Sequence, residues 1–288
     1  MGSTEEIMKC AVFIGTKDEG KFTPRASGFL VSTLYGDIGG FFYVVTAEHV
    51  IYGLSNAGKS IFVRMNTKEG SAADYEVPIS EWHFHPDKSK PTDVAVSFLM
   101  TTPQPLDFRA VLLSGSSVLL RSELTDNLIY EGDAVSIVGL FRSHYGQDHN
   151  IPVVRTGHIA SLNQEPVFTG YCGYTDAYLV ETNSIAGLSG SPVFANKGDI
   201  LHVESAAQLR KMKTGRFQLL GLMHGHFDVR NLNEDVLSDD SGVFKGGINT
   251  GIGVVIPVDK IIETIDQPVI EKLRNETMSK KKGKAAAT

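Results

Sequence analysis

Short apolar runs alternate with turn-forming residues along most of the chain. Many of the runs are rich in Val, Ile, Phe and Tyr, the residues that favour strands. The spacing between them leaves little room for the long amphipathic helices that a parallel α/β fold requires. We therefore predict an all-β fold whose strands include Cys10–Ile14, Gly28–Ser32, Phe41–Val45, Ser60–Met65, Val94–Met100, Ala134–Val138, Ala177–Val180 and Gln218–Met223.

Helical spacing is confined to a few segments. Apolar residues recur at helical intervals in Val258–Ile265, and a second helix follows at Val269–Arg274. Glu204–Met212 predicts a short helix, whereas residues 227–248 are polar, acidic and Gly-rich and predict a long loop. From Ser279 onward the basic tail has no apolar face, which predicts a disordered end.

Length and charge narrow the function classes. A chain of 288 residues suffices for one large β domain or two small barrels. Its net charge of −6 argues against nucleic acid as a partner, and no apolar run is long enough to span a bilayer. Because Met1–Lys9 is polar and acidic and lacks the features of a secretory signal, we expect a cytoplasmic protein.

The two cysteines, Cys10 and Cys172, cannot build a disulfide framework. They could form one bridge, but two separate buried thiols are the favoured interpretation. His83, His85 and Asp87 could be read as a metal cluster, yet a dedicated zinc site needs three or four converging ligands. We favour a surface loop there and expect neither a metal nor a cofactor.

The sharpest local motif runs from Gly187 through Leu188, Ser189, Gly190 and Ser191. Acyl transfer by a serine needs an exposed hydroxyl on a tight turn and backbone N–H groups aimed at the developing oxyanion. The glycines permit such a turn, and the N–H groups of Gly187 and Ser189 would form the oxyanion hole. An ordinary Gly/Ser turn before a strand is the alternative, and Ser191 is a second candidate nucleophile one turn position later.

Two further residues complete a catalytic set. His49 follows the apolar run Phe41–Val45 and would serve as the general base. Asp93 enters an apolar run, where a carboxylate is costly unless it is paired, and would orient the histidine. Each residue alone has an ordinary explanation, a surface histidine or a turn-forming aspartate. The order His, Asp, Ser, with separations of 44 and 96 residues, favours the triad.

Order, spacing and local motifs together resemble the chymotrypsin-fold (trypsin-like) serine proteases, and most closely the HtrA-type bacterial enzymes, here without a PDZ domain. Besides the Ser189 turn, the motifs that carry the resemblance are Ala26–Val31, Val45–Val50, His85-Pro86, Glu131–Val135 with Gly139, Thr156–Ile159 and Gly253–Pro257.

The resemblance implies two antiparallel Greek-key six-stranded β-barrels with a C-terminal helix. The protease domain would span residues 1–265, with barrel one at about 9–115 and barrel two at about 125–257, and 266–288 would hold a helix remnant and a basic disordered tail. It further implies a serine endopeptidase that acts on peptides or proteins through an acyl-enzyme.

The sequence departs from the trypsins at Leu188, where zymogen-activated members carry an aspartate, so we expect no activation by N-terminal cleavage. A trypsin-fold module that has lost catalysis, or a protease switched on by a protein partner, are the alternatives.

The resemblance also assigns a specificity pocket, with Asn183 at its base. Because Asn183 is neutral, we expect an uncharged or apolar side chain rather than Lys or Arg before the scissile bond. Alternatively His224 or His226 would bind a Glu or Gln side chain. The residues assigned to this pocket are Asn183, Ala186, Met223, His224, Gly225 and Gly253.

Overall fold

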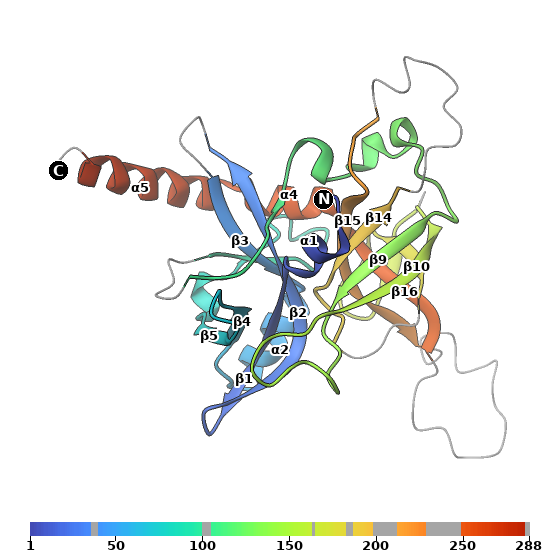
Figure 1. Ribbon diagram of the computed structural model, residues 1–288. Helices are drawn as coiled ribbons and strands as arrows, with labels where there is room; N and C mark the ends of the chain where they lie inside the picture. Colours follow the sequence, from blue (N-terminus) through green and yellow to red (C-terminus); the bar gives the residue numbers. More distant parts are fainter. Residues whose placement is uncertain are drawn as a thin grey trace, which may run out of the picture.

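The computed structural model describes residues 1–35, 40–99, 105–162, 165–182, 187–197, 212–228 and 249–285. Figure 1 shows a mostly β molecule, with an N-terminal sheet beside a C-terminal barrel and helices toward the C-terminus. In this part of the chain no helix is long and apolar enough to cross a membrane.

The N-terminal half forms an eight-stranded sheet in the order β5-β4-β1-β2-β3-β7-β6, with β8 paired to β2. The strands are β1 (Ala11–Asp18), β2 (Lys21–Leu34), β3 (Gly40–Thr46), β4 (Phe62–Asn66), β5 (Ala72–Glu76), β6 (His83–Phe84), β7 (Ala95–Phe98) and β8 (Val111–Leu112).

This sheet differs from the predicted first barrel of six antiparallel strands. Eight strands take part, β8 runs parallel to β2, and the pairing of the described strands does not close on itself. The strand at one end, β6, is only two residues long, and β5 at the other end has no fully buried residue. Neither end therefore offers the long apolar strand that barrel closure would require.

The C-terminal half closes into an antiparallel barrel of six strands in the order β10-β13-β16-β15-β14-β9, which confirms the second predicted barrel. Side chains such as Tyr178, Val180, Val193 and Val255 fill its core. The strands are β9 (Ala134–Gly139), β10 (Val153–Ser161), β13 (Tyr178–Glu181), β14 (Pro192–Asn196), β15 (Phe217–Asp228) and β16 (Asn249–Pro257). A separate hairpin of β11 (Val167–Thr169) and β12 (Gly173–Thr175) stands outside it.

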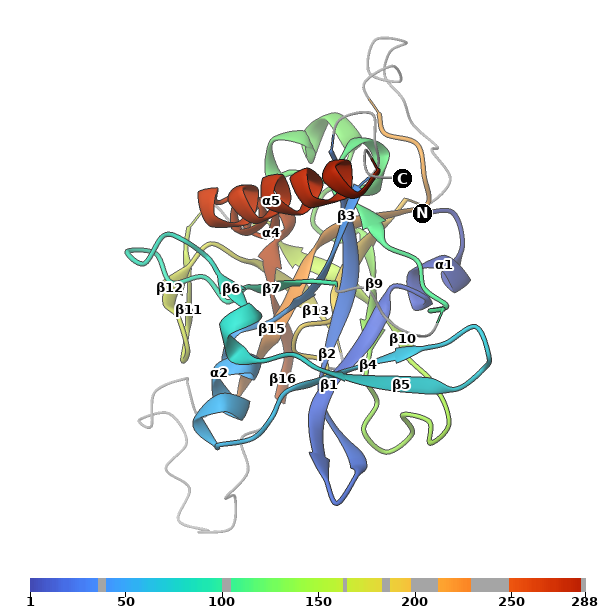
Figure 2. The ribbon, with the colours of Figure 1, turned by 90° about the vertical axis from the view of Figure 1, so that its left-hand side faces the viewer.

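The described residues also contain four α-helices: α1 (Thr4–Met8), α2 (Glu48–Asn56), α4 (Val258–Ile265) and α5 (Pro268–Ala285). Short 3₁₀ turns lie at Ile79–Glu81, Gly115–Ser117, Arg121–Glu123 and Thr125–Asn127. Both α4 and α5 are seen in Figure 2 against the upper part of the molecule.

Helix α4 has the predicted bounds, because Ile261 and Ile265 bury the apolar stripe that the sequence displays. Helix α5 continues past Ser279, where the sequence predicts a disordered tail. Its lysines and Ala285 are strong helix formers, and they extend a helix that Ile270 anchors in the core.

Both cysteines are buried and free, which confirms the interpretation of two separate thiols. The predicted helix at Glu204–Met212 lies outside the described residues apart from Met212. The predicted loop 227–248 also lies outside them except for Phe227 and Asp228, which belong to strand β15 instead.

Candidate active site

His49 is held by the end of a buried strand. Strand β3 ends at Thr46, Ala47 is fully buried, and α2 begins at Glu48, so His49 lies in the first turn of the helix. The Thr46 hydroxyl donates to the Ser27 carbonyl at 2.7 Å, which ties this corner to β2. The imidazole keeps 28% of its surface exposed and can be reached from outside.

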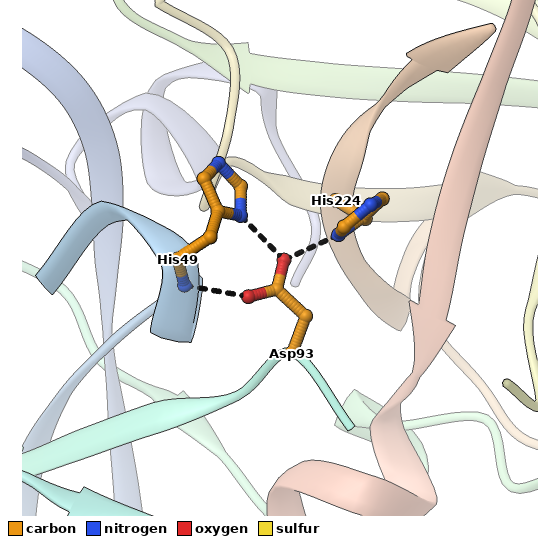
Figure 3. A group of neighbouring side chains, drawn as sticks. All are labelled: His49, Asp93 and His224. Carbon is orange, nitrogen blue, oxygen red and sulfur yellow. Dashed lines mark hydrogen bonds and ion pairs between the residues drawn. The ribbon is translucent and has the colours of Figure 1, made fainter. Parts of the chain in front are cut away.

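Asp93 lies just before β7 and is fully buried. Its Oδ1 accepts the backbone N–H of His49 at 2.8 Å, and its Oδ2 lies 2.7 Å from Nδ1 of the same residue. Figure 3 shows both contacts converging on the carboxylate. Two attachments at different atoms fix the position and the rotation of the ring, so the predicted pairing of His49 with Asp93 is present.

A second imidazole meets the same carboxylate. The Nδ1 of His224, on β15, contacts Oδ2 of Asp93, and its ring lies edge-on to His49 with centroids 5.4 Å apart. The pairing of β15 with β16 shifts register between Met223 and Gly225. Such an irregularity re-aims side chains, and here the buried Met223 is followed by a histidine directed at Asp93.

Electrostatics couple the three residues. Burial alone would raise the pKa of Asp93, but hydrogen bonds with His224 and His49 and the charges of these histidines hold it well below its usual range. Burial likewise opposes a charge on His49, but the hydrogen bond and negative charge of Asp93 leave the pKa of His49 raised. The carboxylate is therefore ionised across the neutral range and favours a proton on His49.

The predicted nucleophile turn adopts a conformation that only glycine takes readily. Gly187 and Gly190 have φ values of 109° and 80°. Between them Leu188 is 1% exposed and packs in the barrel core, while Ser189 is partly exposed. Ser191, the other candidate, is fully buried, and its N–H donates to the Leu188 carbonyl at 2.9 Å.

Close contacts fix where this turn lies. The N–H of Ser27 donates to the Ser189 carbonyl at 3.0 Å, and the Ser27 hydroxyl donates to the Gly187 carbonyl at 2.8 Å. A Cβ added to Gly190 would come within 2.2 Å of the Thr46 hydroxyl oxygen. The Gly190 N–H donates to the Met223 carbonyl at 2.8 Å. The turn thus lies between the strand end that leads to His49 and the strand that carries His224.

The other predicted pocket residues are placed only in part. Met223 is buried, and a Cβ added to Gly253 would lie 3.1 Å from its Cε, so these two stretches of chain are packed together. Gly225 follows His224 on β15. Asn183 and Ala186 lie outside the described residues.

Of the three residues considered as a metal cluster, His85 and Asp87 have partners outside the set. The Nε2 of His85 lies 3.0 Å from Oε2 of Glu263, and Asp87 accepts hydrogen bonds from Ser89. In the described part of the chain, the donor set that converges is His49, Asp93 and His224, whose ligand atoms all lie within 4.8 Å of one another. These could hold a metal ion, although each imidazole already directs its Nδ1 at the carboxylate.

The hairpin of β11 and β12 adds neighbours that the sequence interpretation missed. The ring of Tyr171 lies edge-on to His49 with centroids 5.6 Å apart. Cys172 is buried beside it, and burial raises the pKa of this thiol to about 12, so it is not a thiolate nucleophile at neutral pH. Nothing local in the sequence points to this contact, because Tyr171 and His49 are 122 positions apart.

Solved structures of other proteins have a similar fold. The protease domain of MamO from Magnetospirillum magneticum, in its apo form, is 17% identical, with a TM-score of 0.52 over 92% of this chain and 100% of that one. The HtrA-type protease AlgW, crystallised with a tripeptide, is 17% identical, with a TM-score of 0.50 over 93% of this chain and 62% of that one. At these identities the likeness shows the fold. No curated protein sequence matches the chain.

The family itself is identified from the sequence. Residues 26–201 match the model of the trypsin-like peptidase domain, which is more than half of the chain and includes His49, Asp93 and Ser189. The chain therefore belongs to the family of trypsin-like peptidase domains.

Proposed function

We propose that this protein is a serine endopeptidase in which Ser189 is the nucleophile, His49 the general base and Asp93 the residue that orients it. The observation that carries the proposal is the buried Asp93 carboxylate, bonded to both the backbone N–H and the Nδ1 of His49. Membership of the trypsin-like peptidase domain family and a partly exposed Ser189 on a glycine turn support it.

The chemistry follows from the tautomer. With its Nδ1–H donating to Asp93, neutral His49 keeps the Nε2 lone pair for a proton. The Ser189 hydroxyl attacks the scissile carbonyl and gives its proton to Nε2, and His49 then passes that proton to the leaving amine. Water repeats the sequence on the acyl-enzyme and releases the acid. The N–H groups of Gly187 and Ser189 would hold the oxyanion in both steps.

Burial favours Ser189 over Ser191. The Ser191 hydroxyl is sealed from solvent, and it would lie 2.0 Å from a Cβ added to Gly139, so it packs inside the barrel. A substrate carbonyl could not reach it without unfolding the turn.

We also propose that the peptidase needs no zymogen cleavage and accepts an uncharged or apolar side chain before the scissile bond. Leu188 fixes the turn by packing in the barrel core rather than by an ion pair. Met223 is apolar and lies against Gly253, and Asn183 brings no charge. A peptide-library digest with a preference for Arg or Lys would contradict this specificity.

A fluorophosphonate probe tests the nucleophile. We expect the probe to label the full chain at one site and Ser189→Ala to abolish labelling, while the matched variant Ser191→Ala still reacts. Peptide hydrolysis should fall about 10⁴-fold or more in Ser189→Ala. An unlabelled wild-type chain, or labelling that survives in Ser189→Ala, would reject the proposal and favour a non-catalytic or partner-activated protein.

A further inference from the structure

The Nδ1 atom of His224 contacts the carboxylate of Asp93. We propose that His224 is a positioning residue, a second imidazole that holds the Asp93 carboxylate in place for His49. This inference rests on the proposed peptidase function and adds a residue to it.

The first support is the burial of the carboxylate. Asp93 is fully buried and the His224 side chain is only 12% exposed, so the carboxylate must find its hydrogen bonds within the protein. Oδ1 is taken by the backbone of His49, and Oδ2 is shared by the two imidazoles. Bonds to an ionised acceptor are stronger than neutral ones, so loss of one of them would leave Asp93 less firmly oriented.

The second support is the rigidity of the strand that carries His224. The preceding residue, Met223, donates its N–H to the Ser191 carbonyl at 2.8 Å and accepts the Gly190 N–H at 2.8 Å. These bonds lock β15 to the nucleophile turn. The strand therefore presents the His224 imidazole to Asp93 from a fixed base, independently of helix α2, which presents His49.

The third support is the proton inventory. Because both Nδ1 atoms face a carboxylate oxygen, each neutral ring carries its proton on Nδ1. When His49 takes the proton of Ser189, its positive charge is balanced by the Asp93 carboxylate. The other titratable groups around His49 are Glu48, Tyr171 and Cys172, none of which donates to Asp93 in a described hydrogen bond.

Proton NMR of histidine-labelled protein tests the arrangement directly, in the Ser189→Ala background so that the chain cannot digest itself. We expect two low-field ring N–H resonances, both of which move in Asp93→Asn. His224→Phe, which keeps an aromatic ring against His49, should remove one of them, and the matched control His158→Phe, on an exposed part of β10, should remove neither.

Kinetics separate positioning from packing. His224→Phe should lower kcat/KM about tenfold to a hundredfold through kcat, as expected for a lost hydrogen bond to a charged group. The acid limb of the pH profile of kcat/KM should shift to higher pH in His224→Phe, because His49 no longer shares the Oδ2 atom of Asp93 with a second imidazole. His224→Asn, whose amide nitrogen stands near the place of Nδ1, should restore most of the rate and the wild-type limb.

Two low-field resonances that both survive in folded His224→Phe would overturn the inference, as would a wild-type rate and pH profile in that variant. The two failures are distinguishable. If Ser189 does not react with the fluorophosphonate, the peptidase proposal fails, while the two resonances still report whether His224 holds Asp93.

Discussion

At the scale of single residues, Asp93 organises the site. One buried carboxylate receives a backbone N–H and two imidazoles, and the cost of burying its charge is offset by those three partners. The pairing with His49 is predictable, because an aspartate at the entrance of an apolar run needs a partner. The contact with His224 is not predictable, because it depends on an irregularity in the pairing of β15 with β16.

The raised pKa of His49 has a kinetic consequence. As the proposed general base, His49 works only when neutral. The value of kcat/KM should therefore fall as pH drops through that pKa, with a midpoint above about 6.5, the ordinary histidine value. Initial rates with a neutral peptide across pH 5 to 9 measure it. In Asp93→Asn the rate should fall about 10⁴-fold and the midpoint should move down. A wild-type midpoint below 6 would contradict the pairing.

Glu48, next to His49, should depress stability at neutral pH. Burial raises its pKa to about 7, with Lys88 opposing and Asp93 adding to the shift. Below the ordinary value of 4.5 both folded and unfolded chains are protonated, whereas above it the folded state resists ionisation, so stability is lost as pH rises toward 7.

At pH 8 the free energy of unfolding of Glu48→Gln should therefore exceed that of its parent, so that the variant unfolds at a higher urea concentration. The gain should be only on the order of 1 kcal/mol, since solvent screens this half-buried group. Near pH 4.5 the two proteins should be equally stable. Urea unfolding in the Ser189→Ala background measures both values, and an advantage that is independent of pH would rule out this explanation.

At the scale of elements, the hydrophobic pattern of the sequence predicts the longer strands and helices correctly. It misses strands that are too short to display a pattern. The run Phe41–Val45 falls within β3, and Val258–Ile265 is α4. The two-residue strands β6 and β8 leave no pattern, yet they decide that the first sheet has eight strands and an open order. Closure depends on pairing between distant segments, which composition does not record.

The turn before β14 depends on Leu188 as an apolar anchor. Leu188→Asp would place the aspartate of zymogen-activated relatives into a core of apolar side chains without a partner, and should destabilise the fold by about 3–5 kcal/mol. Leu188→Met, which keeps volume and polarity, should cost less than about 1.5 kcal/mol. Thermal and urea unfolding compare the pair. Equal stability of both variants would mean that the turn is held elsewhere.

At the scale of the molecule, the N-terminal sheet and the barrel meet at the turn that carries Ser189. Ser27 of β2 binds the Ser189 and Gly187 carbonyls, and Thr46 lies against Gly190. His49, Asp93 and Ser189 can be singled out from the sequence. The packing that brings His49 and Asp93 against the Ser189 turn cannot be predicted from it. That packing follows from a glycine small enough to let two backbones approach.

Gly190→Ala should break this meeting point. Its Cβ would lie 2.2 Å from the Thr46 hydroxyl oxygen and 2.3 Å from the Ser27 carbonyl oxygen. Gly20 is a matched control, because it has the same φ of 80° but open space around it. Gly20→Ala should cost about 1–2 kcal/mol from backbone strain alone, with activity kept.

Gly190→Ala should cost more than Gly20→Ala. On the proposed function it should also lower peptide hydrolysis at least a hundredfold, since the Ser189 turn would move away from His49 and Asp93. Urea unfolding and initial rates on the four proteins, including wild type and the double variant, measure both effects. Equal costs for the two substitutions would show that the halves meet without this close approach.

The buried leucine beside Ser189 also bears on how such an enzyme is kept in check. In zymogen-activated trypsins the ion pair forms only after cleavage, so the uncut chain is inactive. Leu188 makes no ion pair, and its packing in the barrel core does not depend on cleavage. On the function proposed above, the chain would be able to cut peptides as soon as the barrel folds. Regulation would then have to act on access to the active site, through a blocking segment, an inhibitor or a low concentration of unfolded substrate chains.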